Sequence, residues 1–464
     1  MSPRRILIVG GSDAGTAAAL SARSTDPDCA IDVLMEDRFP NFSVCGLPFL
    51  LSGEVTGWKE LAHRTEEDFA GRRITLHKES QAVSIRHEHQ ELIAETVGGE
   101  RLFGYDRLVI ATGAEAVTPK IAGADLDGVH RVRTMDDGLA VLDRIESTSP
   151  ESTIIVGGGY VGVELADAFR HRGIGVTLVE STEQPLKTFD PELSALIARE
   201  LESHEVRLLA RTRVERIEAA DSGRRKLRVV GTEGFDLMAD LVILCVGVRP
   251  RTALADGLGC DRGQAGAIRV NRRLETTVDG VFAAGDCVET WHRLLERPAF
   301  LPLGTTAHKQ GAVAGANAAG GAVEFAGTLG TQVVKVFDLA AGRTGLTGNE
   351  AVHEGFDART TEIVTPDHKA YYPGARPLHI RLTGDARDGR LLGAQIVGDY
   401  RAAVAKRLDV MAAALFNRLK VAEILDLDLS YTPPLGSPWD PWQAAARAWC
   451  DERSAGQATR PTQK

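Results

Sequence analysis

The 464-residue chain lacks an excess of positive charge and any long apolar run, and each absence excludes a class of binding partner. Its formal net charge is −10, so no basic field attracts nucleic acid or an anionic membrane surface. No apolar run reaches the ~18 residues that a membrane-spanning helix needs. Residues 1–5 lead directly into a strand-like stretch without a small-residue cleavage site, unlike a signal peptide. We therefore expect a cytoplasmic protein with neither a nucleic-acid nor a membrane partner.

Cysteine pairs are also missing. The six cysteines are scattered, and no two of them form a C-x-x-C motif or have the spacing of metal ligands. We therefore expect no metal site, and each cysteine, taken alone, is best explained as a small buried hydrophobic residue. Only Cys45, within the stretch NFSVCGLP at residues 41–48, has surroundings that indicate chemistry.

A strand, a glycine turn and a helix are predicted near the N-terminus. An apolar strand pattern at residues 5–9 precedes a turn and an alanine-rich helix pattern, and the turn consists of Gly10, Gly11, Ser12, Asp13, Ala14 and Gly15. Glycines let the backbone approach a pyrophosphate, and the helix N-terminus favours its negative charge. A second strand pattern ends in Glu36, at the distance expected of a carboxylate that binds a ribose 2′-hydroxyl group. These residues predict dinucleotide binding.

A second unit of the same kind follows. A strand pattern at residues 152–156 leads into a full G-x-G-x-x-G motif made by Gly157, Gly159 and Gly162, and a later strand ends in Glu180. Two such units imply two bound nucleotides. Glu180 would accept a hydrogen bond from a 2′-hydroxyl group but repel a 2′-phosphate, and residues 181–184 contain no arginine. The sequence therefore predicts NADH in preference to NADPH.

Two further strand patterns end in short polar motifs. Residues 105–110 lead to Ala111, Thr112 and Gly113, and residues 281–284 lead to Gly285 and Asp286. The four motifs, in this order, resemble the FAD-dependent pyridine nucleotide–disulfide oxidoreductases over residues 4–450. The resemblance implies an α/β fold with two Rossmann-like dinucleotide-binding domains, one for FAD and one for NAD(P)H, plus a C-terminal α+β dimerisation domain.

The resemblance also implies domain boundaries and a homodimer. The FAD-binding domain is expected at residues 1–115 and 248–327, the NAD(P)H-binding domain at 116–247 and the dimerisation domain at 328–450. Residues 451–464 are polar and lack periodicity, so we expect a disordered tail there.

Within this family the chain resembles the single-cysteine branch. No second cysteine lies a few residues from Cys45 and no His-Pro-Thr motif ends the chain, whereas residues 41–48 are similar to the S-x-x-C-G-x-P stretch of that branch. The resemblance makes Cys45 the redox nucleophile. A thiolate must attack, and Cys45 is expected to begin a helix at residues 47–52 whose N-terminus lowers the thiol pKa.

Two members of the branch are coenzyme A disulfide reductases, with their polysulfide-reducing relatives, and NADH oxidases or peroxidases. The oxidases carry a histidine in the first glycine turn, where this chain has Asp13, so the reductase is favoured. Residues 367–375 and 428–434 resemble reductase motifs that place Tyr371, Tyr372 and Tyr431 across the dimer from the partner's cysteine. These tyrosines can also be explained as interface aromatics.

The chain departs from the pattern of the branch at two points. Val44 stands where an asparagine is common before the cysteine, and the spacing from Glu36 to Cys45 is one residue shorter than usual.

Other roles come from the same resemblance. Tyr160 is similar to the aromatic that covers the flavin until nicotinamide displaces it, although a packing tyrosine is the alternative. Glu164 matches an acid near both rings, or else lies on the helix surface. The remaining implied cofactor-binding residues are Gly247, Gly304, Thr305 and Thr306. Arg23, His63 and Arg64 are candidates for binding coenzyme A phosphates, with solvated surface positions as the alternative.

The expected function is an FAD-dependent NAD(P)H oxidoreductase that reduces coenzyme A disulfide, or a related persulfide or mixed disulfide, at Cys45. One alternative is an NADH oxidase or peroxidase that uses a sulfenate at Cys45. A second is a flavin-bearing redox sensor, and a third is electron transfer to a ferredoxin, which needs no cysteine.

Overall fold

The computed structural model describes residues 3–220 and 226–458, which form two compact units. The first unit contains Met1–Pro119, Arg131–Thr148 and Val246–Thr328. The second contains Lys120–His130, Ser149–Cys245 and Leu329–Lys464. The mixed α/β fold predicted from the sequence is confirmed, since both units carry a parallel sheet with helices against it.

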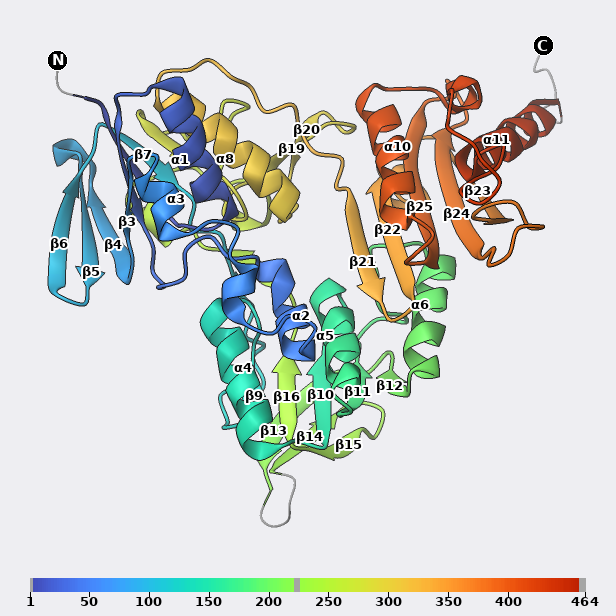
Figure 1. Cartoon of the computed structure of the whole chain (residues 1–464), viewed down its shortest axis with the longest axis horizontal. Helices are drawn as coiled ribbons and strands as arrows, with labels where there is room; N and C mark the ends of the chain where they lie inside the picture. The colour runs from blue at the N-terminus through green and yellow to red at the C-terminus, as the bar shows by residue number, and fades with distance from the viewer. Residues whose placement is uncertain (1–2, 221–225, 459–464) are drawn as a thin grey trace. The chain divides into compact units, whose positions relative to one another are not determined.

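The first unit is built on a five-stranded parallel sheet. Its strands in spatial order are β18 (Val281–Ala283), β7 (Arg107–Ile110), β1 (Arg5–Val9), β2 (Ala30–Leu34) and β3 (Ile74–His77). Helices α1 (Asp13–Thr25) and α8 (Gly304–Ala318) run side by side against this sheet (Figure 1). Strand residues such as Ile8 and Val109 pack with alanines of both helices to form one core. Small side chains thus let the two helices approach closely.

The approach of α1 to α8 leaves no room for a side chain at two glycines. A Cβ atom on Gly311 would lie 2.1 Å from the carbonyl oxygen of Ala14, and one on Gly315 would lie 2.0 Å from that of Ala18. Both contacts are with backbone, which can yield only if a whole helix moves. The position of α8, and of the turn at its N-terminus, therefore depends on these glycines.

We expect Gly311→Ala to lower the free energy of unfolding of the first unit by about 1–3 kcal/mol, because overpacking forces the helices apart. Gly257→Ala in α7 (Ala253–Gly257) is the matched control, since a Cβ atom there meets nothing within 4 Å. That change should be neutral or stabilising by about 0.4–1 kcal/mol. Thermal melting of both variants with FAD bound tests the difference, and equal melting temperatures would contradict the packing argument.

The rest of the first unit surrounds the sheet. An antiparallel meander contains β4 (Ser80–Arg86), β5 (Glu91–Thr96) and β6 (Gly99–Gly104). Helices α2 (Leu47–Ser52) and α4 (Met135–Thr148) pack against each other, so close that a Cβ atom on Gly138 would lie 2.8 Å from the Leu47 side chain. The remaining elements are α3 (Glu66–Ala70), the pair β8 (Ala114–Ala116) and β17 (Val248–Pro250), and the hairpin of β19 (Thr290–His292) and β20 (Arg297–Ala299).

The second unit contains its own parallel sheet, with strands in the order β12 (Val206–Leu209), β11 (Gly175–Val179), β10 (Ser152–Val156), β16 (Leu241–Leu244) and β9 (Val129–His130). Its helices α5 (Tyr160–His171) and α6 (Pro191–Ser203) follow β10 and β11 along the chain. A three-stranded meander adds β13 (Val214–Ala219), β14 (Leu227–Gly231) and β15 (Asp236–Ala239). The strand, turn and helix order repeats that of the first unit.

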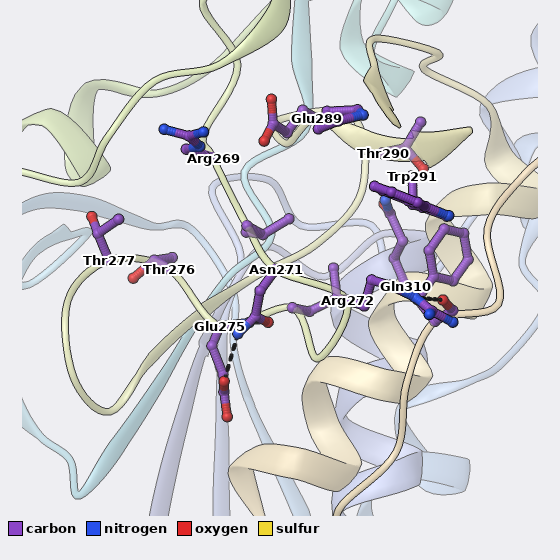
Figure 2. A pocket seen from close by; sticks show the side chains of 14 residues that line it. Arg269, Asn271, Arg272, Glu275, Thr276, Thr277, Glu289, Thr290, Trp291 and Gln310 are labelled. Carbon is purple, nitrogen blue, oxygen red and sulfur yellow. Dashed lines mark hydrogen bonds between the residues drawn. The ribbon is translucent and has the colours of Figure 1, made fainter. Parts of the chain in front are cut away.

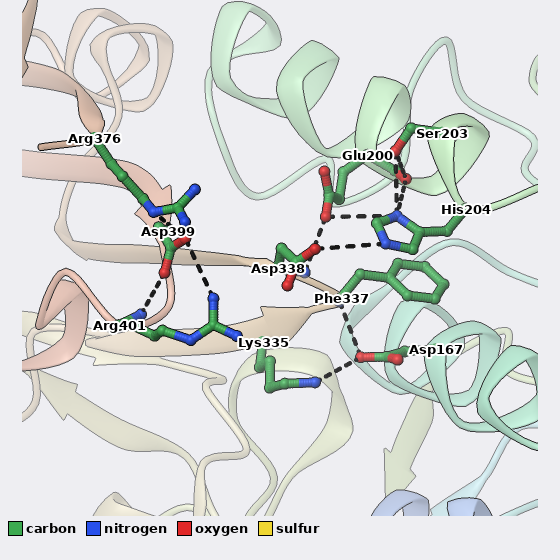
Figure 3. A network of polar contacts seen from close by, with 10 residues as sticks. All are labelled: Asp167, Glu200, Ser203, His204, Lys335, Phe337, Asp338, Arg376, Asp399 and Arg401. Carbon is green, nitrogen blue, oxygen red and sulfur yellow. Dashed lines mark hydrogen bonds and ion pairs between the residues drawn. The ribbon is translucent and has the colours of Figure 1, made fainter. Parts of the chain in front are cut away.

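An antiparallel sheet completes the second unit, with strands in the order β21 (Gln332–Val336), β22 (Leu339–Gly345), β25 (Leu391–Asp399), β24 (Pro377–Asp385) and β23 (Ala358–Pro366). Helices α10 (Val404–Phe416) and α11 (Pro441–Ala458) pack against it (Figure 1). Along the chain, α9 (Gly348–His353) follows β22. The turn between β21 and β22 is held by α5 and α6. Asp167 accepts hydrogen bonds from the Phe337 amide (2.9 Å) and Lys335 (3.0 Å), and His204 stacks on the Phe337 ring (Figure 3).

The prediction of disorder from residue 451 onward is wrong as far as Ala458, because α11 continues to that residue. The sequence lacks apolar periodicity there, but polar contacts anchor the helix. Arg453 donates hydrogen bonds to the carbonyl oxygens of Ala386 (2.9 Å) and Arg387 (3.1 Å), and Glu452 accepts one from Thr361 (2.7 Å). Residues 459–464 lie outside the described residues.

Candidate functional site

The first glycine turn brings three backbone segments together. Gly10 has a φ of 113°, and a Cβ atom on it would lie 2.1 Å from the carbonyl oxygen of Ala111. A Cβ atom on Gly15 would lie 1.7 Å from the carbonyl oxygen of Gly10. Helix α1 begins at Asp13, and within the described residues its N-cap, Ser12, makes no side-chain cap hydrogen bond. The N-terminal turn of α1 therefore lacks a side-chain cap, and a pyrophosphate could accept hydrogen bonds from its N–H groups.

Glu36 and the Ala111-Thr112-Gly113 motif are tied to the same distant residue. Glu36 lies two positions beyond β2 and forms an ion pair with Arg251, with 2.7 Å between Oε2 and Nη1. The Thr112 hydroxyl donates a hydrogen bond to the Arg251 carbonyl oxygen at 2.6 Å. Arg251 thus holds one carboxylate oxygen of Glu36, a contact that the sequence does not predict.

The Gly285-Asp286 motif forms a buried turn after β18. Burial raises the pKa of Asp286, and the nearby Arg133, whose Nη2 lies 2.8 Å from Oδ2, acts in the opposite direction. Gly285 has a φ of 88°, and its N–H donates a hydrogen bond to Gln310 of α8 at 3.0 Å. The turn is therefore fixed to both the sheet and α8.

Asp13 lies between the N-termini of α1 and α8. Its Oδ1 is 3.1 Å from Nε2 of His308, and its Oδ2 would be 3.2 Å from a Cβ atom on Gly304. Thr305 is exposed, whereas Thr306 is buried and its hydroxyl donates a hydrogen bond to Thr328 at 3.1 Å. The first unit thus combines a helix N-terminus without a side-chain cap, a glycine turn too tight for side chains and a half-buried carboxylate. These residues fit the pyrophosphate and ribitol of FAD.

The second glycine turn repeats the first. Gly157 has a φ of 108°, and a Cβ atom on Gly162 would lie 1.9 Å from its carbonyl oxygen, whereas one on Gly159 would meet open space. Glu180 accepts hydrogen bonds from the N–H groups of Gly158 (2.7 Å) and Thr182 (2.8 Å). Burial alone would raise the pKa of Glu180, but these hydrogen bonds lower it overall. The carboxylate is therefore charged and fixed, as a ribose ligand requires.

Arg211, which no sequence motif indicated, lies beside the segment that follows Glu180. Arg211 forms an ion pair with Glu183 and its N–H donates a hydrogen bond to the carbonyl oxygen of Thr182 at 2.8 Å. It is more than 25 residues from Glu183 along the chain, so no local pattern could reveal it. Glu183 thus engages a guanidinium group that could otherwise bind a phosphate.

Helix α5 carries Tyr160 and Glu164 on successive turns. Burial raises the pKa of Tyr160 to about 12, and its hydroxyl lies 3.4 Å from Thr188. Burial, supported by the charge of Asp167, raises the pKa of Glu164 to about 7, while Lys335 opposes the shift. Glu164 is half-buried, so the alternative of an exposed position on the helix surface is not supported, and its place near the two rings stays a prediction. Gly247 is exposed, with a φ of 114°.

Cys45 is exposed, whereas the other cysteines are buried or half-buried. It lies in a short 3-10 turn, Val44–Gly46, and Gly46 is the N-cap of α2, so the helix begins at Leu47, two residues after Cys45. Phe39, Phe42 and Leu47 hold the segment in a small apolar cluster. Burial raises the pKa of Cys245 to about 12 and that of Cys287 to about 11, so these thiols are poor nucleophiles.

The tyrosines belong to the second unit. Tyr371 is 73% exposed, and Tyr372 and Tyr431 are each 43% exposed. Desolvation and a hydrogen bond with Tyr371 raise the pKa of Tyr431, so two hydroxyl groups that are 60 positions apart in the chain lie together. An N–H from Lys369 donates a hydrogen bond to the Pro433 carbonyl oxygen at 3.3 Å, joining the two stretches.

Sequence reasoning missed His368, which supports this cluster. It is 8% exposed, its Nδ1 lies 2.9 Å from Oδ1 of Asp367, and its ring packs edge-on against Tyr372 with 5.7 Å between centroids. In the described part of the chain its Nε2 has no hydrogen-bond partner. The resemblance of residues 367–375 to a reductase motif was the signal for this stretch, but only its tyrosines were given a role, because one histidine in a sequence is usually structural.

Arg23 was a candidate for binding coenzyme A phosphates, but its guanidinium group is already engaged by backbone carbonyl groups. Its guanidinium group donates hydrogen bonds to the carbonyl oxygens of Arg72 (2.9 Å), Pro27 (2.7 Å) and Arg73 (2.7 Å). Arg23 therefore fastens α1 to the following loops, and the proposed phosphate contact would have to come from His63, which is exposed, or Arg64.

One group of possible metal ligands occurs among residues 3–220 and 226–458. Donor atoms of Glu200, His204 and Asp338 lie within 4.8 Å of one another (Figure 3). His204 Nδ1 is 3.0 Å from the Glu200 carbonyl oxygen, and Glu200 accepts a hydrogen bond from the Asp338 amide at 2.9 Å. These contacts explain the cluster without a metal ion, because they stabilise the β21–β22 turn. Separately, none of the described helices is long and apolar enough to cross a membrane.

Comparison with known proteins gives one consistent family. Residues 4–311 match the family described as pyridine nucleotide-disulphide oxidoreductase, and residues 331–440 match its dimerisation domain. An NAD(P)H sulfur oxidoreductase (CoA-dependent) of Pyrococcus furiosus is 35% identical over 96% of this chain and 99% of its own. An NADH oxidase of Methanocaldococcus jannaschii is 33% identical over 95% and 98%. The structure of reduced Bacillus anthracis CoADR-RHD matches with a TM-score of 0.94 and 30% identity, over 98% of this chain and 81% of that one.

Proposed function

Because the chain belongs to the pyridine nucleotide-disulphide oxidoreductase family, we propose that it reduces coenzyme A disulfide, or a related persulfide, at Cys45 with electrons from NAD(P)H. The enzyme is a flavoprotein of the disulfide reductase type that depends on FAD and a pyridine nucleotide. The observation that carries the substrate assignment is the exposure of Cys45 while the other five thiols are buried or half-buried. Similarity to the CoA-dependent sulfur oxidoreductase supports the same class of substrate.

The chemistry divides between named side chains. The Cys45 thiolate attacks a substrate R–S–S–R, an S–S bond to Cys45 forms, and one R–S⁻ leaves. Two electrons from NAD(P)H then cleave the mixed disulfide, which regenerates the Cys45 thiolate and releases the second R–S⁻. FAD, when bound, supplies the two-electron relay between nicotinamide and sulfur. Protons for the two thiolates come from water or from a phenol such as Tyr431, so one NAD(P)H and one proton give two thiols.

A direct test uses mass measurement and anaerobic turnover. Isolated enzyme should carry a reductant-removable adduct of coenzyme A mass on Cys45, or should acquire one when it is mixed with coenzyme A disulfide. Anaerobic NADH consumption should depend on added disulfide. If NADH oxidation stops without oxygen or peroxide despite added disulfide, the enzyme is instead an oxidase or peroxidase.

That second candidate has one structural observation in its favour. His308 lies 3.1 Å from Asp13, so an imidazole reaches the first glycine turn from α8 even though the turn itself contains none. The similarity to an NADH oxidase of M. jannaschii points the same way. Disulfide-dependent turnover in the anaerobic assay decides between the two.

The nucleotide preference proposed for this chain is NADH over NADPH. Glu180 is a charged, fixed carboxylate and Arg211 is neutralised by Glu183. We expect Glu180→Gln to lower kcat/KM for NADH about tenfold, the loss of one charge-assisted hydrogen bond, while NADPH is used at least as well as before. Glu183→Gln leaves the ribose ligand intact, so it should keep kcat/KM for NADH, and it frees Arg211, so it should raise kcat/KM for NADPH. Wild-type efficiency tenfold higher with NADPH would overturn the preference.

Glu164 should give stability a characteristic pH dependence. Its pKa is raised from 4.5 to about 7 in the folded chain, so between these values the folded state keeps a proton that the unfolded state has lost. The contribution of Glu164 to stability therefore falls as pH rises from about 4.5 to 7 and is constant above that range. Melting temperatures at pH 5 and pH 8 should differ less for Glu164→Gln than for wild type. Identical differences would show that Glu164 does not titrate in this range.

The dimerisation domain leads us to propose a homodimer whose two subunits share each site. Tyr371 and Tyr431 are exposed although one hydroxyl is hydrogen-bonded to the other. Exposed phenol groups held in this way suit a site completed by a second subunit.

A further inference from the structure

A cavity in the first unit lies outside every role assigned above. It has a volume of about 490 Å³, within the range of small-molecule sites, and opens between the segment of residues 269–277 and the hairpin strand β19 (Figure 2). Its wall includes the aromatic rings of Trp291 and Phe325 and the guanidinium groups of Arg269 and Arg272. Aromatic faces, cations and hydrogen-bonding groups therefore meet around one space.

The inner wall holds one hydroxyl group that the fold itself does not satisfy. Thr290 is 3% exposed, and in the described part of the chain its hydroxyl group has no hydrogen-bond partner. Glu289 is 4% exposed, and its Oε2 accepts a hydrogen bond from the Gln264 amide at 3.2 Å. A buried hydroxyl without a partner destabilises a fold, so its presence beside a carboxylate indicates a ligand that supplies the missing hydrogen bonds.

The mouth of the cavity carries positive charge. The Arg269 side chain is 60% exposed, and its Nη1 is 4.0 Å from the carboxylate of Asp261, so it is only loosely held. Arg272 is more firmly placed, since its Nη1 lies 3.2 Å from Glu324 and its Nε donates to the Phe325 carbonyl oxygen. The carboxylate of Glu275 is already engaged by Asn271 (2.7 Å) and Arg273 (3.0 Å). Arg269 therefore remains able to bind an incoming anion.

The cavity is separate from the FAD residues. In the sheet order β18-β7-β1-β2-β3, the first glycine turn follows β1 and Glu36 follows β2, whereas the cavity segment bridges to the edge strand β18 through Glu275 and Phe282. None of the described residues assigned to FAD lines it. Gln310 connects the two, because it lines the cavity and accepts the hydrogen bond from Gly285, which follows β18.

We propose that this cavity binds a purine mononucleotide. The base N–H edge pairs with Glu289 and Thr290, the ring packs against Trp291, and the phosphate lies at the mouth on Arg269. Carboxylates accept hydrogen bonds from base amino groups, aromatic side chains stack on bases, and arginine binds phosphate in its planar fork. A mononucleotide has this order of parts, a hydrogen-bonding base at one end and an anion at the other.

Binding of AMP to the FAD-loaded enzyme tests the proposal, with saturating NAD⁺ present so that the second glycine turn is occupied. Calorimetry should show one AMP per chain, with adenosine binding more weakly and inorganic phosphate weaker still. Thr290→Val, which keeps the shape and removes the hydroxyl, should weaken AMP binding about tenfold and raise the melting temperature of the AMP-free enzyme. Arg269→Gln should weaken AMP binding in low salt while leaving adenosine binding unchanged.

Thr153→Val is the matched control for Thr290→Val. Thr153 lies in β10 of the second unit, is 1% exposed, and its hydroxyl also has no partner among the described residues. Its replacement should raise the melting temperature without changing AMP affinity. The proposal is overturned if no AMP binds beside NAD⁺, if phosphate alone binds as tightly as AMP, or if AMP affinity is the same in wild type, Thr290→Val and Arg269→Gln. The exposed position of Arg269 keeps the last comparison valid even if a core substitution fails to fold.

Discussion

Replacing Cys45 with serine should lower the rate of coenzyme A disulfide reduction by a factor on the order of 10³ or more, because a serine hydroxyl is neither ionised near pH 7 nor able to form an S–S bond. Binding of FAD and NADH should survive, since the two glycine turns and Glu180 lie elsewhere in the chain. Anaerobic mixing of the variant with NADH should still bleach the flavin absorbance, whereas added disulfide should no longer restore it. Flavin that is reduced by NADH but not reoxidised by disulfide would show that the variant is defective in the reaction between Cys45 and the disulfide.

Cys450→Ser is the matched control. Cys450 is half-buried in α11 and burial raises the pKa of its thiol, so its loss should leave disulfide turnover within about twofold of wild type. If Cys45→Ser keeps turnover with an external acceptor such as a ferredoxin, the enzyme transfers electrons without a thiol. If nucleotide binding changes a protein partner while no turnover is found in wild type, the chain is a sensor. Disulfide reduction at the wild-type rate by Cys45→Ser would remove the basis of the proposed function.

Local features of the sequence predicted the fold and the two nucleotide turns well. A strand, a glycine turn and a helix are consecutive in the chain, and the structure shows why glycine is needed at Gly15 and Gly162, where a Cβ atom would strike a carbonyl oxygen. The family and fold are confirmed. The assignment of individual site residues, including Cys45, remains a prediction.

Contacts between distant segments could not be predicted in this way. Arg251 meets Glu36, Arg211 meets Glu183, and no periodicity or motif relates the members of either pair. The length of α11 was missed for a related reason, because Arg453 and Glu452 stabilise it through polar contacts that leave no apolar pattern. Burial also depends on residues distant in the chain: the sequence left open whether Glu164 lies near the two rings or on the helix surface, and in the structure burial raises its pKa to about 7.

Restoration of activity by mixing two inactive variants should reveal whether the tyrosines serve the cysteine of the partner subunit. Tyr371→Phe/Tyr431→Phe removes both phenol hydroxyl groups, which are hydrogen-bonded to each other, and should lower disulfide turnover by about 10²-fold if one of them donates a proton to the leaving thiolate. Cys45→Ser is inactive for a different reason. The Cys45→Ser chain retains both tyrosines, and the double tyrosine variant retains Cys45.

In a mixed dimer with a two-fold axis, one site combines the intact cysteine of one subunit with the intact tyrosines of the other, and the second site has neither. Random exchange makes half of the dimers mixed, so the mixture should recover roughly a quarter of wild-type turnover per subunit. Tyr372→Phe mixed with Cys45→Ser is a useful comparison, because Tyr372 packs on His368 and need not donate a proton. If subunits exchange, as labelled chains can show, and no activity returns, then cysteine and tyrosines act within one chain or the tyrosines do not act at all. The activity of the double tyrosine variant alone separates these cases, since an interface role predicts dissociation of the dimer and a proton-donor role predicts an intact dimer with a lowered kcat.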